Sequence, residues 1–254
     1  MAVVAPGPPP MAAPARRRVG AQVRMELVLT LRRGESVLLT FLIPVLVLVF
    51  FSLVDVLPTG EEQAVDFLLP GVLALSVMST AMTGLAIATG FERSSGVLKR
   101  LAVTPLTRRD LVAAKLASVL VVETLQVAVI LVVGLLLGWD PTAGLGTTLA
   151  AMVLASVAFA GIGMLMAGTL PALTTLALAN ATYVVLLFVG GVVTPLDDLP
   201  TALRVVARAL PIGALSDIAH GALGAGPVPG GAWLVLGAWA LVAPALAAWR
   251  FRWE

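Results

Sequence analysis

The chain has 254 residues, of which 59% are hydrophobic and only 12% are charged, and its formal net charge is +2. Soluble domains carry about 25% charged residues, so this composition excludes an ordinary soluble protein and indicates an all-α integral membrane protein. The absence of cysteine excludes disulfides and thiolate metal sites, and a single histidine excludes a histidine metal cluster, so we expect no metal site.

The N-terminal 36 residues differ from the rest of the chain because they combine prolines and arginines. Residues 1–18 are rich in Pro, Ala and Arg, and their arginines follow the apolar residues, which predicts a disordered tail rather than a signal peptide. Residues 19–36 carry apolar side chains at i+4 spacing between Arg24, Arg32 and Arg33. This pattern predicts a helix that lies at the cytoplasmic interface of a membrane.

Six apolar stretches follow, each long enough for a transmembrane helix of about 20 residues. The region between Asp140 and Asp197 contains no charged residue and is too long for one span, and Gly168 and Pro171 mark the break within it. The predicted membrane domain is therefore 37–249, with a short end at 250–254. Its six spans are 37–57, 67–90, 116–138, 145–167, 172–193 and 231–249.

The basic residues alternate between the connections. Six Lys/Arg precede the first span, six lie in 91–115 and two follow the last span, whereas the intervening connections hold only Arg204 and Arg208. The positive-inside rule then predicts that both termini and 91–115 are cytoplasmic. The same distribution argues against nucleic-acid binding, because the basic residues lie where topology requires them. The preference for Arg over Lys, with abundant Ala, Val, Leu and Gly, is typical of a GC-rich bacterial genome, so we expect a bacterial cytoplasmic membrane protein.

Residues 91–115, FERSSGVLKRLAVTPLTRRDLVAAK, form the densest charge cluster of the chain. Ser94 or Ser95 is predicted to cap a short amphipathic helix that ends before Pro105. Thr107 and Asp110 then resemble a capping box that opens a helix running into the third span. This segment is either a helix that docks on another protein or a basic loop that only fixes topology, and the residues themselves favour neither.

A second non-spanning helix is predicted over 199–210, on the outer side before the sixth span. Leu199, Leu203, Val206 and Leu210 fall on one face, with Arg204 and Arg208 on another.

The 91–115 segment resembles the E-R-x-x-G-x-L-x-R-L-x-x-T-P-L motif of ABC-2 type transporter permeases, in particular drug-resistance permeases of the daunorubicin-exporter type. In this motif Ala114 stands where the family often has Gly. A second family pattern lies around the predicted outer helix, and His220 falls near where that pattern expects Arg. The first motif matches at Glu92, Arg93, Gly96, Leu98, Arg100, Leu101, Thr104, Pro105, Leu106 and Lys115, and the second, around the outer helix, at Pro195, Leu196, Leu199, Pro200 and Pro211.

The resemblance implies that residues 91–106 are a coupling helix that docks on a separate ATP-binding subunit, present in two copies, and that the chain forms a homodimer. The chain would then be the permease of an exporter for an amphipathic drug, antibiotic or lipid-like molecule. A glycan-export permease and a non-transporting membrane anchor of an ATPase are the alternatives. Neither Lys99 nor Lys115 follows a glycine, so no P-loop is present; we expect a non-enzymatic chain without cofactors, whose partner binds ATP and Mg.

Polar residues inside the predicted spans are the remaining candidates. Glu123 and Gln126 lie three residues apart in the third span, and an intramembrane acid indicates a functional site. They either line a translocation path or form hydrogen bonds between helices, with Asn180 or Tyr183 of the fifth span as partners. His220 is expected in a loop. Ser156 with Ala160, and Gly163 with Ala167, are small-residue pairs expected to allow close helix packing.

Overall fold

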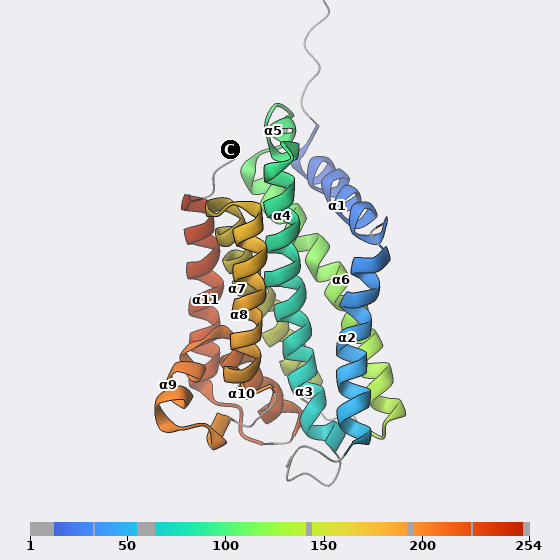
Figure 1. Cartoon of the computed structure of the whole chain (residues 1–254), viewed down its shortest axis with the longest axis vertical. Coiled ribbons are helices and arrows are strands. Elements are labelled where there is room, and N and C mark those ends of the chain that lie inside the picture. Colours follow the sequence, from blue (N-terminus) through green and yellow to red (C-terminus); the bar gives the residue numbers. More distant parts are fainter. Residues whose placement is uncertain are drawn as a thin grey trace, which may run out of the picture.

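The computed structural model describes residues 13–32, 34–54, 64–140, 144–192, 196–224 and 226–250. Every regular element in these ranges is a helix, which confirms the predicted all-α class. Figure 1 shows a bundle of long helices with short helices at both ends. The elements are α1 (Ala15–Arg32), α2 (Gly34–Leu53), α3 (Ala64–Val77), the π-helix η1 (Met78–Gly84), α4 (Leu85–Ser94), α5 (Val97–Ala102), α6 (Arg108–Leu136), α7 (Leu145–Thr169), α8 (Ala172–Val189), the 3₁₀ turn η2 (Leu196–Asp198), α9 (Thr201–Ala209), α10 (Pro211–Leu223) and α11 (Gly230–Arg250).

Five helices in the described ranges are long and apolar enough to cross a membrane. They are the continuous rod Ala64–Ser94, made of α3, η1 and α4, together with α6, α7, α8 and α11, and they correspond to the predicted second to sixth spans. The first predicted span, 37–57, falls on α2, whose apolar part Thr40–Leu53 is shorter than a full span. Residues 55–57 lie outside the described part of the chain, so six spans remain a prediction.

The rod of α3, η1 and α4 is the core of the bundle. In its most apolar window 67% of the residues are buried, against 17% in α8 and 22% in α11. Figure 1 shows α2 and α6 on one side of this rod and α7, α8 and α11 on the other. The rod is therefore covered by protein, whereas α8 and α11 leave most of their apolar surface for lipid or another chain.

Small residues of α7 set how closely its neighbours approach. A Cβ added at Gly163 would lie 2.6 Å from the backbone oxygen of Met82 in η1, and one at Gly161 would lie 2.5 Å from the backbone nitrogen of Pro244 in α11. Only glycine fits at such backbone contacts. The close packing predicted for this part of α7 thus occurs within the chain.

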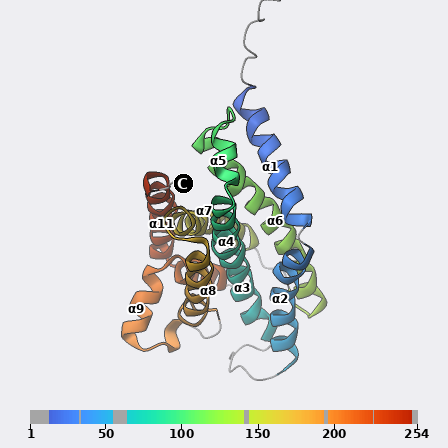
Figure 2. The same cartoon turned by 45° about the horizontal axis from the view of Figure 1, so that its top comes forward.

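The two ends of the bundle differ in charge. One end, called the α5 end from here on, carries α1, α5, the start of α6 and the last turn of α11 (Figure 1). Figure 2 shows α1 lying along α6 at this end. Every described Lys and Arg belongs to it except Arg204 and Arg208, which lie at the opposite end, the α9 end. Helix α1 begins at Ala15, so residues 15–18 are helical and do not belong to a disordered tail.

The α9 end holds two short helices where the sequence predicted one. Helix α9 is shorter than the predicted 199–210, and its buried residue is Ala207, whereas Leu203 and Val206 are about half exposed (45% and 53%). Helix α10 was missed, although ten of its 13 residues are buried. His220 lies in α10 and not in a loop: its Nδ1 is 2.9 Å from the backbone oxygen of Ser216 and its Nε2 is 3.1 Å from that of Phe67. Pro211 at the first helical position and the helically spaced apolar residues after it explain why a helix forms here.

Candidate functional site

The connection between α4 and α6 forms a tip that projects from the α5 end. Helix α4 closes with the hydroxyls of Ser94 and Ser95, which donate to the backbone oxygen of Phe91 (3.0 and 2.8 Å). Gly96 follows with φ of +74°, a left-handed conformation that favours glycine, and it directly precedes α5. The predicted serine cap of α5 is therefore wrong, because both serines end the preceding helix and the N-cap of α5 is Gly96.

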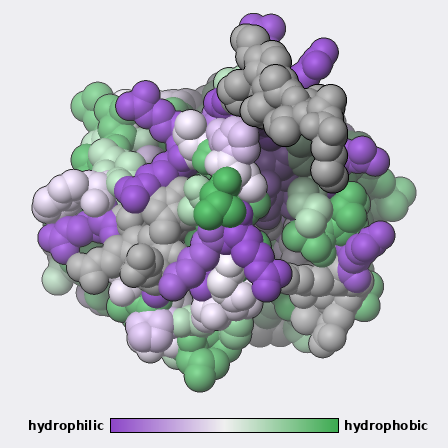
Figure 3. All heavy atoms as spheres, turned by 90° about the horizontal axis from the view of Figure 1, so that it is seen from above, coloured by the Kyte–Doolittle hydropathy of each residue, from purple (hydrophilic) through white to green (hydrophobic). Residues whose placement is uncertain are grey.

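Helix α5 has one buried side and one exposed side. Leu98 is fully buried and Leu101 is half-buried, whereas Lys99, Arg100, Thr104 and Pro105 are exposed. Val103, which follows α5 directly, is 88% exposed. Seen from above, hydrophilic side chains gather around a small apolar spot on this face (Figure 3). The tip therefore offers a mixed basic and apolar surface.

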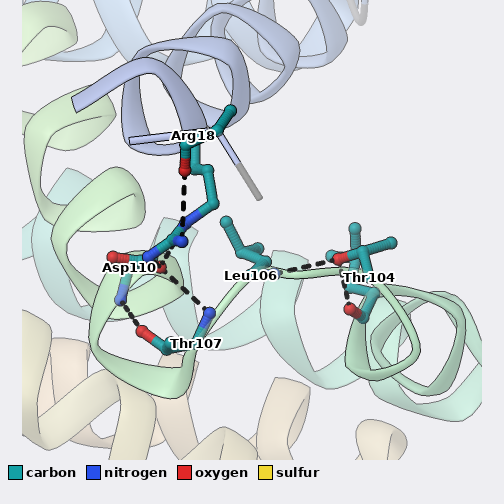
Figure 4. Close-up of polar contacts among 7 residues, drawn as sticks. Arg18, Thr104, Leu106, Thr107 and Asp110 are labelled. Atoms are coloured by element: carbon teal, nitrogen blue, oxygen red, sulfur yellow. Dashed lines mark hydrogen bonds and ion pairs between the residues drawn. The ribbon is translucent and has the colours of Figure 1, made fainter. Parts of the chain in front are cut away.

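The second half of the tip is held by a capping box, as predicted. The backbone nitrogen of Asp110 donates to the Thr107 hydroxyl (3.2 Å), and the backbone nitrogen of Thr107 donates to the Asp110 carboxylate (3.0 Å). Arg18 of α1 pairs with the same carboxylate at 2.9 Å. In Figure 4 this pair links α1 to the start of α6. Beside it, the backbone nitrogen of the half-buried Leu106 donates to the Thr104 hydroxyl (3.3 Å). The capping box and the α1 helix thus fix the direction in which the tip leaves the bundle.

Glu92 and Arg93, the first two residues of the motif, bind within the chain. Glu92 pairs with Lys115 Nζ at 2.7 Å, and Glu26 of α1 pairs with the same nitrogen at 3.0 Å. The Lys115 side chain is only 1% exposed. Arg93 donates to the backbone oxygen of Leu170 (2.6 Å), just after the last turn of α7. These side chains tie α1, α4, α6 and α7 together beneath the tip.

Glu123 and Gln126 contact partners other than those predicted. The Ser156 hydroxyl of α7 donates to Glu123 Oε2. Gln126 accepts from the Thr80 hydroxyl (3.0 Å) and donates to the backbone oxygen of Thr40 (2.8 Å). These hydrogen bonds join α6 to α7, η1 and α2, and none of them involves Asn180 or Tyr183.

The two predicted partners lie elsewhere. Asn180 donates to the backbone oxygen of Leu176 in its own helix, and Tyr183 packs at the edge of the apolar core. Helix α8 has the least buried apolar window of the five candidate spans, and only Thr175, Ala179 and Leu186 are buried in it.

The predicted outer residues begin α9 and α10. Pro200 is the N-cap of α9, Pro211 is the first residue of α10, and Leu199 is half-buried beside η2. Arg208 pairs with Asp197 at 3.0 Å. Pro195 lies outside the described residues.

Comparison with known proteins identifies the family of this chain. A model of the ABC-2 type transporter family matches residues 18–221, from α1 to α10. The chain belongs to the ABC-2 type transporter family. This confirms the family inferred from the 91–106 motif, and it makes the chain a multi-pass membrane protein. An ABC-2 membrane domain is a permease component without an ATP-binding cassette, so the family implies a partnership with an ATP-binding subunit.

A curated relative supports the same assignment. Nodulation protein J from Rhizobium leguminosarum bv. viciae is 30% identical to this ABC-2 chain over 149 residues, which are 58% of this chain and 57% of that protein. The match spans little more than half of the relative's length. It supports the family, and its name specifies no cargo.

Sequence reasoning missed Lys115 as a buried ion-pair centre. Lys115 was counted among the topology-setting basic residues, yet it shares a face of α6 with Leu111 and Ser118, both buried. A lysine directly before the predicted third span, at helical spacing from apolar Leu111, was the available signal, because such residues are rarely buried without partners. Its partners Glu26 and Glu92 lie far away in sequence, and only the fold brings them together.

Proposed function

We propose that this chain is the membrane-spanning permease subunit of an ATP-driven ABC-2 type exporter in a bacterial cytoplasmic membrane. The tip formed by residues 91–106 is its docking element for the ATP-binding subunit. The observation that supports docking most directly is that Val103 is 88% exposed and that Lys99 and Arg100 are exposed as well. The other side of the tip, at Leu98, is buried. A loop that served only topology would not need buried anchors beneath it.

The chain works as a homodimer with two ATP-binding subunits. It has six spans, and the α5 end, with both termini, faces the cytoplasm. The distribution of Lys and Arg supports this orientation, and the exposed apolar faces of α8 and α11 leave surface for a second copy. The cargo is an amphipathic drug, antibiotic or lipid-like molecule.

The test separates the exposed face of the tip from its buried side. Leu98 is unsuitable for this test, because its full burial means that a polar substitution would unfold the tip. Val103→Asp changes only the exposed surface, and the matched control is Val205→Asp at the α9 end, where Val205 is 66% exposed. Tagged chains would be purified from native membranes, and the co-purifying ATPase activity measured.

We expect wild type and Val205→Asp to retain a nucleotide-hydrolysing partner and Val103→Asp to lose most of it at equal membrane content. Retention by all three variants would contradict docking through this tip. Efflux of a fluorescent amphiphile from cells, with and without ATP depletion, then tests export, and a chain that binds its partner but exports nothing would be a membrane anchor.

Orientation is tested separately, since the cysteine-free chain gives no labelling background. A cysteine at Val205 should react with a membrane-impermeant maleimide in intact cells. A cysteine at Val103 should react only after lysis, and the reverse pattern would invert the proposed topology.

A further inference from the structure

An apolar seam runs between α6 and α7 and forms two hollows. The hollow nearer the α5 end is bordered by α6, α7 and α11, and the one nearer the α9 end by α6 and α7 alone. The second is an open groove of about 410 Å³, a volume within the range of small-molecule sites. Their α6 linings follow one another at intervals of three or four residues and so share one face of the helix: Val112, Leu116, Leu120, Glu123, Val127 and Leu131.

Glu123 is the only ionisable residue that lines either hollow among the described residues. It stands near the middle of α6 and lines the larger hollow, and its hydrogen-bond partner Ser156 stands near the middle of α7. From Glu123 the larger hollow extends toward the α9 end, past Val127 to Leu131. A carboxyl group therefore lies on the largely apolar wall of the larger hollow.

The Glu123 carboxyl group is incompletely satisfied. The residue is 5% exposed, and its Oε1 has no hydrogen-bond partner in the described part of the chain. Ser156 is its one donor, but the same hydroxyl lies 2.8 Å from the backbone oxygen of Met152. A hydroxyl has one hydrogen, so it serves only one of these acceptors at a time. Such a carboxyl group is stable either protonated or, as the carboxylate, beside a positive counter-charge, so a bound cation favours the ionised form.

We propose that this seam is a binding site for hydrophobic organic cations, such as lipophilic amines or onium ions, with Glu123 as the counter-ion and the apolar walls around the hydrophobic body. The proposal rests on the proposed export function and narrows its cargo. No cationic side chain among the described residues lines either hollow. Helix α7 has no charged residue, and Lys115 lies eight residues before Glu123 on α6, about 12 Å along the axis at 1.5 Å per residue. Lys115 is paired with Glu26 and Glu92. The charge and the apolar walls together favour a cationic amphiphile over a neutral lipid.

The test compares two ions of the same shape and opposite charge, tetraphenylphosphonium and tetraphenylborate. Radiolabelled tetraphenylphosphonium binding to the purified full-length chain in neutral detergent would be measured without ATP or partner. We expect saturable binding that unlabelled tetraphenylphosphonium displaces and tetraphenylborate does not. Glu123→Gln, which keeps the shape and can still bond Ser156, should weaken it at least tenfold.

A second pair of variants keeps the test valid if Glu123→Gln fails to fold. Ala128 lines the larger hollow and is exposed, so Ala128→Trp should fill the hollow while leaving the carboxyl group in place, and binding should fall. Val132, 56% exposed on the same helix, does not line it, and Val132→Trp should bind as wild type does.

Three results would overturn the proposal. The first is equal affinity for the two ions, and the second is unchanged binding in Glu123→Gln or Ala128→Trp. The third is no saturable binding to wild type, which is the result expected if lipid or a second copy of the chain fills the seam. Because no partner or ATP is present, these outcomes are independent of the docking and efflux tests. A wild-type chain that shows no saturable cation binding but supports ATP-driven efflux would reject the site and leave the exporter standing.

Discussion

Replacing Lys115 by Met should be among the most destabilising single substitutions at the α5 end. Lys115 Nζ lies 2.7 Å from a Glu92 oxygen and 3.0 Å from a Glu26 oxygen, and the three side chains are 1%, 13% and 11% exposed. Methionine keeps most of the volume but removes the cation that the two carboxylates share. Removing one partner of a buried ion pair costs about 3–5 kcal/mol, and here the two remaining charges also repel each other.

The glutamate variants should behave differently. Glu26→Gln or Glu92→Gln leaves one neutral ion pair and loses one charged hydrogen bond, a cost of about 1.5–3 kcal/mol. Combining both with Lys115→Met removes all three charges, so the triple variant should be more stable than Lys115→Met alone, since groups in one network are not additive. The sign of this rescue depends on the charges and not on packing.

Stability can be followed by tryptophan fluorescence during heating in detergent, because the chain has five tryptophans and no cysteine for thiol dyes. With about 2–4 °C per kcal/mol for a chain of this size, Lys115→Met should melt at least about 6 °C below wild type. A triple variant that melts no higher than Lys115→Met would refute the electrostatic reasoning. So would a Lys115→Met variant that melts with wild type.

Two further predictions concern single contacts. Thr107→Ala removes the capping-box acceptor and should cost about 1 kcal/mol, visible as a lower melting temperature, whereas Thr107→Ser should restore it; equal melting of Ala and Ser variants would count against the cap. Gly163→Ala places a methyl group 2.6 Å from the Met82 backbone oxygen and should cost about 1–3 kcal/mol by overpacking. Its control is Gly146→Ala in the same helix, where a Cβ meets nothing within 4 Å, and similar melting of the two variants would contradict the packing described.

The elements that the sequence predicted well are those with a strong local signal. Apolar length located five of the spans, and Gly168 with Pro171 located the break between α7 and α8, which end and begin at Thr169 and Ala172. The capping box was readable because Thr107 and Asp110 have the required spacing. These features depend on a few neighbouring residues, so they do not require knowledge of the fold.

The errors arose where a side chain had several possible partners. Ser94 and Ser95 can cap either the helix before or the helix after them, and the left-handed Gly96 decides for the earlier one. Glu123 could pair with any facing helix. Its bond to Ser156 follows from α7 packing beside α6, which no pattern within either helix specifies. Helix α10 was missed because its apolar run follows directly on α9 and is shorter than a span.

The geometry of α6 connects the two sites. Its first turn carries Asp110, which holds the tip and α1; the next turns carry Lys115, which binds α1 and α4; and Glu123 follows eight residues later on the same continuous helix. Helix α6 is continuous from Arg108 to Leu136, with no break between its first turn and Glu123. The buried anchors join the tip to α6. We therefore expect a movement of the tip to displace α6, and with it the wall of the seam that holds Glu123. A loop flexible enough to absorb that movement would have to lie between Thr107 and Glu123, and the structure has none there.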